Sequence, residues 1–147
     1  MTPSVRIATA ADVQSCQELE QQAQGNNAGA RGAAALFAEQ PISFISEGPG
    51  GFTLIVEVDS VVVGFATVQI SSVAGNNVAT VVRVFVTARA RRVGVGDALI
   101  TAAKQHARQA NCVRIDALSL PGDRDTKNLY ERNGLTARLI IATSALD

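Results

Sequence analysis

Between residues 52 and 86 the hydrophobic positions form long runs that are rich in β-branched side chains. The runs 52–58, 61–70 and 78–86 each predict a β-strand. Asp59 and Ser60 stand between the first two runs and predict a tight hairpin, and "AGNN" at 74–77 marks the next turn. Because these connections are short, we expect the three strands to be antiparallel neighbours.

On both sides of this region, apolar and small residues recur at helical spacing. The longest helical pattern runs over 94–110, with a period close to 3.6 residues. Near the N-terminus, Thr9 and Asp12 have the spacing of a capping box ahead of a second helix. A short helix is predicted over 33–40, before Pro41, and another over 125–134, with Gly134 as its C-cap.

Three further strands complete the predicted fold. They cover 4–10, 112–120 and 136–146; the second shows little alternation, so we expect it to be buried on both faces. The order of elements is β-α-α-β-β-β-α-β-α-β, which predicts an α/β protein with a mixed sheet and helices on its faces. A chain of 147 residues fits one domain, so we expect a single domain over 1–147.

Composition narrows the possible partners and the compartment. The 13 basic and 13 acidic side chains give a net charge of zero, which argues against a nucleic-acid partner. Cys16 and Cys112 have no metal-site spacing and suggest no disulfide framework, so both are expected to be free thiols. No apolar run is long enough to cross a membrane, and the first residues lack the pattern of a signal peptide. We therefore expect a cytoplasmic protein with no membrane partner.

The stretch "RARRVGVGDAL" at 89–99 is the strongest chemical signal, because glycine-rich turns before helices bind phosphates. The Rossmann pattern fails because Leu99 stands in place of its third glycine, and the P-loop fails because no lysine follows Gly96. A third pattern, [QR]-x-x-G-x-[GA], is matched by Arg91, Gly94 and Gly96.

This third pattern resembles the pyrophosphate loop of the GNAT-type (GCN5-related) N-acetyltransferase superfamily, and its surroundings strengthen the likeness. A strand ending "VFV" precedes it, and "LYERNGL" at 129–135 is similar to the superfamily's "LYEKxGF" element. The resemblance covers roughly residues 52–136, while the first fifty residues agree only in the order of their elements. It implies a mixed, mostly antiparallel sheet of six to seven strands with helices on both faces.

The resemblance also implies acetyl-CoA as co-substrate, with no metal. Its pantetheine arm would pair with backbone groups of Val84, Phe85 and Val86. Its phosphates would lie against the loop and the following helix, formed by Arg91, Arg92, Val93, Gly94, Val95, Gly96 and Asp97. The missing Cβ atoms of the two glycines would let backbone amides approach the anion, and Arg89 is a further candidate for charge. Asp97 would lie close to the anion, so we expect its side chain to point away.

For the chemistry, the resemblance implies that Tyr130 is the general acid for the thiolate of coenzyme A. The superfamily often carries a carboxylate base, but the matching positions hold Thr80, Arg83 and Leu118. Glu57, Asp116 and Asp123 are possible substitutes, a water chain is another, and the base stays unassigned. Arg83 could instead favour a carboxylate-bearing substrate. We expect His106 and Cys112 to have packing roles.

The predicted function is transfer of an acetyl group from acetyl-CoA to a primary amine of a small molecule or peptide. The alternative is a coenzyme A-binding module of the same fold that is inactive and acts as a sensor or interaction partner. The acceptor should lie where the first two helices meet the opening beside the strand over 78–86, with Phe37 and Phe44 as candidate lining residues. Dimers are common in the superfamily, so a homodimer is left open.

Overall fold

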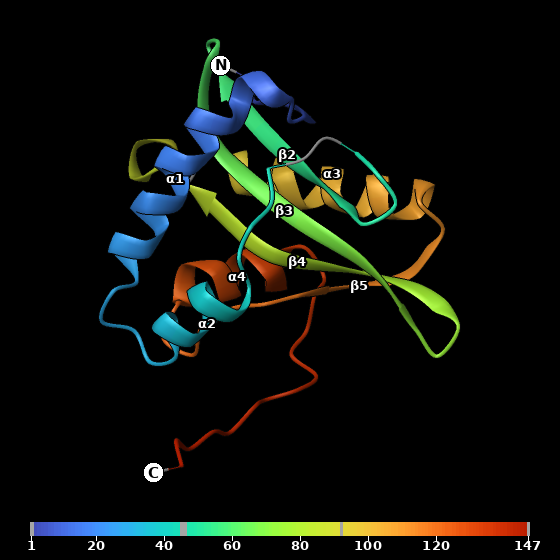
Figure 1. Cartoon of the computed structure of the whole chain (residues 1–147). Helices are drawn as coiled ribbons and strands as arrows, with labels where there is room; N and C mark the ends of the chain where they lie inside the picture. The colour runs from blue at the N-terminus through green and yellow to red at the C-terminus, as the bar shows by residue number, and fades with distance from the viewer. Residues whose placement is uncertain (1, 45–46, 92, 147) are drawn as a thin grey trace.

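The computed structural model describes residues 2–44, 47–91 and 93–146 and contains one five-stranded sheet (Figure 1). The strands are β1 Ser4–Ile7, β2 Gly51–Val58, β3 Val61–Val73, β4 Asn76–Val86 and β5 Cys112–Ala117, and they lie in the order β1-β2-β3-β4-β5. The first four are antiparallel neighbours, and β4 and β5 are parallel. The predicted mixed, mostly antiparallel sheet is confirmed, although it has five strands rather than six to seven.

Two tight turns connect the central strands. Val58 pairs with Val61 across a two-residue loop in which Asp59 and Ser60 both have positive φ, 52° and 66°. The β3–β4 turn repeats this geometry with Ala74 at 51° and Gly75 at 83°. Two central residues of positive φ define the turn whose twist matches that of paired strands, so both predicted turns form hairpins.

The helices lie in two layers on opposite sides of the sheet (Figure 1). Helices α1 (Val13–Asn26) and α2 (Ala33–Glu39) lie on one side, and α3 (Val95–Gln109) and α4 (Arg124–Arg132) on the other. Two 3-10 turns, Ala10–Asp12 and Ala88–Ala90, lead into α1 and the segment before α3. The Asp12 carboxylate accepts the N–H of Thr9 at 2.8 Å, as the capping pattern predicts.

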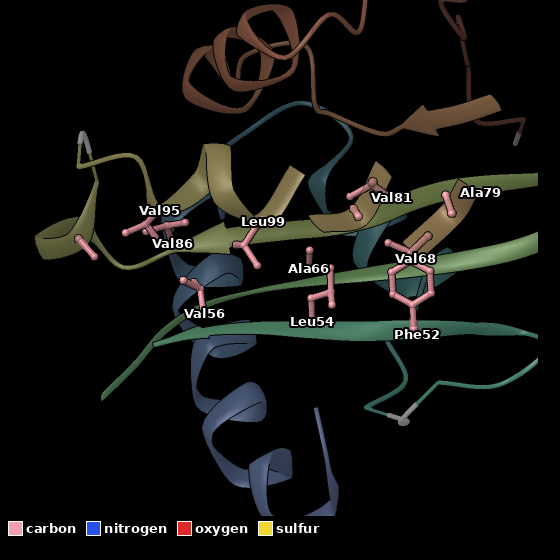
Figure 2. Packing of buried hydrophobic residues seen from close by; sticks show 13 residues of the cluster. Phe52, Leu54, Val56, Ala66, Val68, Ala79, Val81, Val86, Val95 and Leu99 are labelled. Atoms are coloured by element: carbon pink, nitrogen blue, oxygen red, sulfur yellow. The ribbon is translucent and has the colours of Figure 1, made fainter. Parts of the chain in front are cut away.

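The main core lies between α3 and the sheet, because alternate residues of each strand point to that face (Figure 2). From the strands come Phe52, Leu54, Val56, Ala66, Val68, Ala79 and Val81, and α3 contributes Val95, Leu99, Ala103 and Ala107. A second cluster on the opposite face joins Cys16, Leu19 and Ala23 of α1 to Ile55, Phe65 and Phe85. The central strands are therefore covered on both sides.

Two predictions about the C-terminal part are wrong. No strand forms over 136–146, where Leu139, Ile140 and Ile141 are 70%, 89% and 81% exposed. A strand is stable only when its edge is paired and one face is covered, and this segment has neither. Because no described strand pairs with its outer side, β5 is an edge strand. It is also not buried on both faces, since Val113 is 61% exposed.

Candidate functional site

A β-bulge in β4 opens the sheet at the point where the candidate residues gather. Thr67 pairs with Arg83 whereas Val68 pairs with Val81, so Val82 is an extra residue on β4. Pairing between β4 and β5 runs only to Val81 and Ala117, followed by one bond from the N–H of Leu118 to the carbonyl of Val81. Because a bulge bends its strand, β4 and β5 diverge beyond this point.

Beyond Val81, the divergence leaves the outer edge of β4 without a partner strand among the described residues. The N–H of Thr87 donates to the Val63 carbonyl at 2.9 Å, which makes these two residues a hydrogen-bonded pair. Such pairs alternate along an antiparallel ladder with pairs whose backbone groups point outward. By this alternation Val84 and Val86 direct their backbone groups to the open edge, while those of Phe85 face β3.

The glycine loop leads directly from this edge into α3. Gly94 is the N-cap of α3 and has φ of 80°, a left-handed conformation that favours glycine. The first intrahelical bond runs from Ala98 N to the Gly94 carbonyl, so the amides of Val95, Gly96 and Asp97 precede the bonded part of the helix. The side chain of Val95 belongs to the core, so its contribution to a binding site would come from its backbone.

Gly96 also has a packing role that the sequence did not suggest. A Cβ atom built on Gly96 would lie 3.0 and 3.2 Å from the two terminal carbons of Leu129. Its lack of a side chain therefore allows α4 to pack closely against α3. By contrast, none of the described atoms beyond its chain neighbours lies within 4 Å of a Cβ on Gly94, where the constraint is the backbone angle.

Asp97 points toward α4, in keeping with the expectation that it turns away from a bound anion. Its carboxylate accepts from Asn133 Nδ2 at 2.8 Å and from Arg132 at 3.4 Å. Partial burial opposes ionisation, but these hydrogen bonds outweigh it and lower the pKa of Asp97. The carboxylate is thus held by α4 at the rim of the opening.

The arginines of the loop differ in their surroundings. Arg91 folds back over the end of β4, where its Nε donates to the Val86 carbonyl at 3.0 Å and its Cζ lies 5.5 Å from the centre of the Phe85 ring. Arg89 is exposed, as is Val93. Arg92 lies outside the described residues. Arg91 is therefore the loop arginine that the structure brings to the open edge of β4.

Tyr130 reaches the other side of the opening from α4. It is buried, and its hydroxyl donates to the Leu118 carbonyl at 2.8 Å, just past the end of β5. Burial raises the pKa of Tyr130 above its usual range, the charge of Asp123 raises it further, and Arg83 has the opposite effect. The phenol is therefore protonated at neutral pH, as a proton donor must be.

These groups line one cavity of about 810 Å³. Its walls include the open edge of β4, the first turn of α3, the segment after β5, α4, and the facing ends of α1 and α2. Gly94, Gly96 and Arg91 lie at one end, and Leu36 and Phe37 of α2 belong to another wall, beside the contact of Arg83 with α1 and α2. The volume and the mixed polar and apolar walls are typical of a small-molecule site.

The comparison with family models matches the acetyltransferase (GNAT) family over residues 13–135. The chain belongs to this acetyltransferase family. Comparison with curated proteins gives no match. Among solved structures, the chain is similar to a ribosomal-protein-alanine N-acetyltransferase from Brucella melitensis biovar Abortus 2308, with 17% identity, coverage of 99% and 100% of the two chains and a TM-score of 0.75.

Two more solved structures have the same fold. The aminoglycoside N-acetyltransferase AAC(6')-Iy, solved in complex with CoA, has 17% identity, coverage of 97% and 100% and a TM-score of 0.71. A putative acetyltransferase from Agrobacterium tumefaciens str. C58 has 22% identity, coverage of 97% and 99% and a TM-score of 0.72. At these identities the likeness shows that the GNAT fold extends over almost the whole chain.

The candidate bases of this acetyltransferase are engaged in other contacts. Asp116 accepts from Arg114 and Arg138, both at 3.2 Å, and these bonds outweigh its partial burial and lower its pKa. Glu57 accepts from Arg6 at 2.8 Å. Asp123 does line the cavity, where its two oxygens accept from the Thr126 amide at 3.1 Å and hydroxyl at 2.7 Å and cap α4.

Arg83 is buried in a contact that the sequence did not reveal. Its guanidinium makes a two-pronged ion pair with Glu20 of α1, with three N–O distances of 2.8 to 3.1 Å. It also donates to the Gln40 carbonyl at 2.9 Å and lies 4.5 Å from the centre of the Phe37 ring. Since Glu20 already binds this guanidinium, the interpretation of Arg83 as a free receptor for a substrate carboxylate does not fit the structure.

The remaining candidates lie in packing or surface positions. His106 packs against the Phe52 ring at 5.3 Å, and its Nδ1 is 3.3 Å from Glu47. Cys16 is buried in the α1 cluster, and burial raises the pKa of its thiol to about 11. Cys112 is partly buried at the start of β5, and both thiols are free. In the parts of the chain that the structure describes, no metal-binding cluster is found and no helix is suited to crossing a membrane.

Proposed function

We propose that this protein transfers the acetyl group of acetyl-CoA to a primary amine. The proposal rests on one observation: in a member of an acetyltransferase family, the unpaired edge of β4 forms a continuous cavity wall between the first turn of α3 and Tyr130. AAC(6')-Iy, which shares this fold, has been solved with CoA and with a CoA-linked bisubstrate analogue. The residues present fit such a ligand.

Each part of the site matches one part of acetyl-CoA. The amides at the start of α3 and the positive end of its dipole suit the pyrophosphate, with Arg91 nearby. The outward backbone groups of Val84 and Val86 suit the amides of the pantetheine arm, which would add to β4 like another strand. The end of that arm would then lie toward the bulge, between β4 and Tyr130.

The reaction proceeds by direct attack. The lone pair of the amine nitrogen forms a bond to the thioester carbonyl carbon, the carbon–sulfur bond breaks, and the sulfur leaves as a thiolate. Tyr130 supplies the proton for the sulfur, and its hydroxyl leaves the Leu118 carbonyl to do so. The attacking nitrogen loses a proton to water, and water returns a proton to the Tyr130 phenolate, so the products are an amide and a free thiol.

Deprotonation of the amine has a measurable consequence. An alkyl amine has a pKa of about 10.4, so only a small neutral fraction exists at pH 7. With no carboxylate at Thr80, Arg83 or Leu118, we expect kcat/KM to rise about tenfold per pH unit from pH 7 to 9. A plateau that begins near pH 7 would instead identify a base on the protein.

Two measurements test the proposal. Acetyl-CoA at about 100 times its Kd should add about 2.7 kcal/mol to stability and raise Tm by several degrees. Thiol release should then appear when a suitable amine is added, and a panel of arylalkyl amines, amino acids, peptides and aminoglycosides provides the acceptors. If millimolar acetyl-CoA does not change Tm, the protein is not an acetyl-CoA-dependent enzyme.

One observation favours a second function, coenzyme A binding without transfer. The Tyr130 hydroxyl is engaged with Leu118, and no acidic residue occupies the positions where the family often has its base. A Tm shift with acetyl-CoA, combined with no thiol release for any amine of the panel, would support this sensor or interaction role.

A further inference from the structure

The ion pair between Glu20 and Arg83 lies beside the cavity wall that α1 and α2 form, at a distance from the phosphate loop, the glycine-containing segment 91–97. The Arg83 side chain is 5% exposed and that of Glu20 is 11% exposed. Placing two charges out of water costs several kcal/mol per ion, and their attraction need not repay it. A buried pair is therefore weak evidence for stability, and its function must be sought in what it positions.

The pair connects three segments that are distant in the sequence. Glu20 belongs to α1 and Arg83 to β4, and the two are separated by 63 residues. The same guanidinium holds the Gln40 carbonyl at the end of α2 and carries the Phe37 ring on its face. Arg83 thus fixes α2 and its aromatic side chain against the opening beside the bulge.

The pair also determines the charge of the end of the cavity that α1 and α2 line. Arg91 lies 3.8 Å from Asp125 and Arg132 lies 3.4 Å from Asp97, and all four line the end formed by the phosphate loop and α4. In contrast, the described lining residues of α1, its C-cap and α2 are all uncharged: Ala23, Asn26, Asn27, Leu36 and Phe37. Arg83 is the lining cation next to them, and Glu20 cancels its charge.

We propose that the Glu20–Arg83 pair sets the specificity for the acceptor, which is an amine joined to an uncharged, apolar group. The inference depends on the proposed acetyl transfer. The neutral wall and the Phe37 ring accept an apolar group, whereas an acceptor carboxylate would have to displace Glu20 from Arg83. The carboxylate of Asp123, also in the lining, further disfavours an anionic acceptor.

The test compares two amines that differ by one carboxylate, phenethylamine and L-phenylalanine, with kanamycin as a polycation. For the full chain, thiol release should give a kcat/KM for phenethylamine at least tenfold above that for either of the others. Glu20→Gln leaves Arg83 without its counter-charge, so the phenethylamine to L-phenylalanine ratio should fall at least tenfold. The KM for acetyl-CoA should stay unchanged.

Controls separate specificity from folding. Glu18→Gln removes the same charge from an exposed position of α1 and should leave the ratio as in the wild type. Where Glu20→Gln does not fold, Glu20→Gln/Arg83→Gln removes both charges and should keep the preference for phenethylamine. Phe37→Ala should lower kcat/KM for phenethylamine and L-phenylalanine by similar factors, because both carry the phenyl group that this ring would contact.

The outcomes distinguish the two proposals. Wild-type preference for L-phenylalanine or kanamycin overturns the inference and leaves acetyl transfer standing. An unchanged ratio in folded Glu20→Gln also overturns it, since the pair would then have only a structural role. A double variant that prefers L-phenylalanine does the same. Acetyl-CoA binding without thiol release for any amine refutes the proposed transfer, and the inference with it.

Discussion

Replacement of Tyr130 by phenylalanine separates a chemical role of its hydroxyl from a structural one. The change removes the 2.8 Å hydrogen bond to the Leu118 carbonyl but keeps the buried ring. A hydrogen bond contributes about 0.5–1.5 kcal/mol net, and an acceptor left unpaired costs about 1–3 kcal/mol, so the loss should be about 1–3 kcal/mol. At about 2–4 °C per kcal/mol, Tm should fall by several degrees.

The effect on turnover should be larger than this loss of stability explains. If Tyr130 protonates the thiolate, kcat should fall at least about tenfold, or about 1.4 kcal/mol in the barrier, while the Kd for coenzyme A changes little. Both are measured by thiol release and by titration, well below the Tm of the variant. Wild-type turnover in Tyr130→Phe would remove the acid role.

A matched control tests whether any lost buried hydrogen bond has the same effect. Thr53 is fully buried on β2, and its hydroxyl donates to the Ser43 carbonyl at 2.9 Å. Thr53 does not belong to the cavity lining described above. The same hydroxyl is 3.1 Å from that of Thr67, so Thr53→Val should lower Tm at least as much as Tyr130→Phe and leave kcat unchanged. An equal loss of kcat in both variants would mean that the loss reflects stability alone.

Three further predictions concern folding. The Arg6 guanidinium holds the pKa of Asp12 at about 2, so the ionised carboxylate stabilises the protein above about pH 4. Between pH 4 and pH 2 the free energy of unfolding should fall by on the order of 1–2 kcal/mol as Asp12 is protonated. In Asp12→Asn, acid unfolding measurements should not show this pH-dependent loss. Gly96→Ala puts a Cβ 3.0 Å from a terminal carbon of the buried Leu129 side chain, and this contact should cost more than the helix-propensity gain of about 1 kcal/mol, so calorimetry should show a lower Tm; a higher Tm would refute the packing role of Gly96. Removal of 137–147 should change Tm by less than about 2 °C, because the described side chains there are exposed, and a larger drop would show that the segment packs in solution.

The sequence was sufficient where a local rule decides the structure. Turn residues and hydrophobic spacing predict the two hairpins, the helix over 94–110 and the end of α4 at Gly134, which follows the C-cap Asn133 and has φ of 83°. The expected strand over 136–146 failed because its apolar residues satisfy the local pattern but find no partner edge. Pairing and burial are tertiary conditions, and a window of sequence carries no information about them.

The candidate site shows the same division between local and long-range information. The loop at 91–97 could be found from its glycines, yet Gly96 serves helix packing through Leu129, a contact to a different helix. The bulge at Val82 left no signal, because it is a shift of register between two strands. It nevertheless determines which backbone groups of β4 face the opening.

Arg83 is the position at which reasoning from single residues and reasoning from the structure lead to opposite expectations. Taken alone, an arginine beside a reaction site predicts an anionic acceptor. With Glu20 on two of its nitrogens and Phe37 on its face, the same arginine leaves the wall without net charge. The acceptor preference therefore belongs to the pair, and one substitution on α1, at a residue outside the described cavity lining, should reduce it at least tenfold.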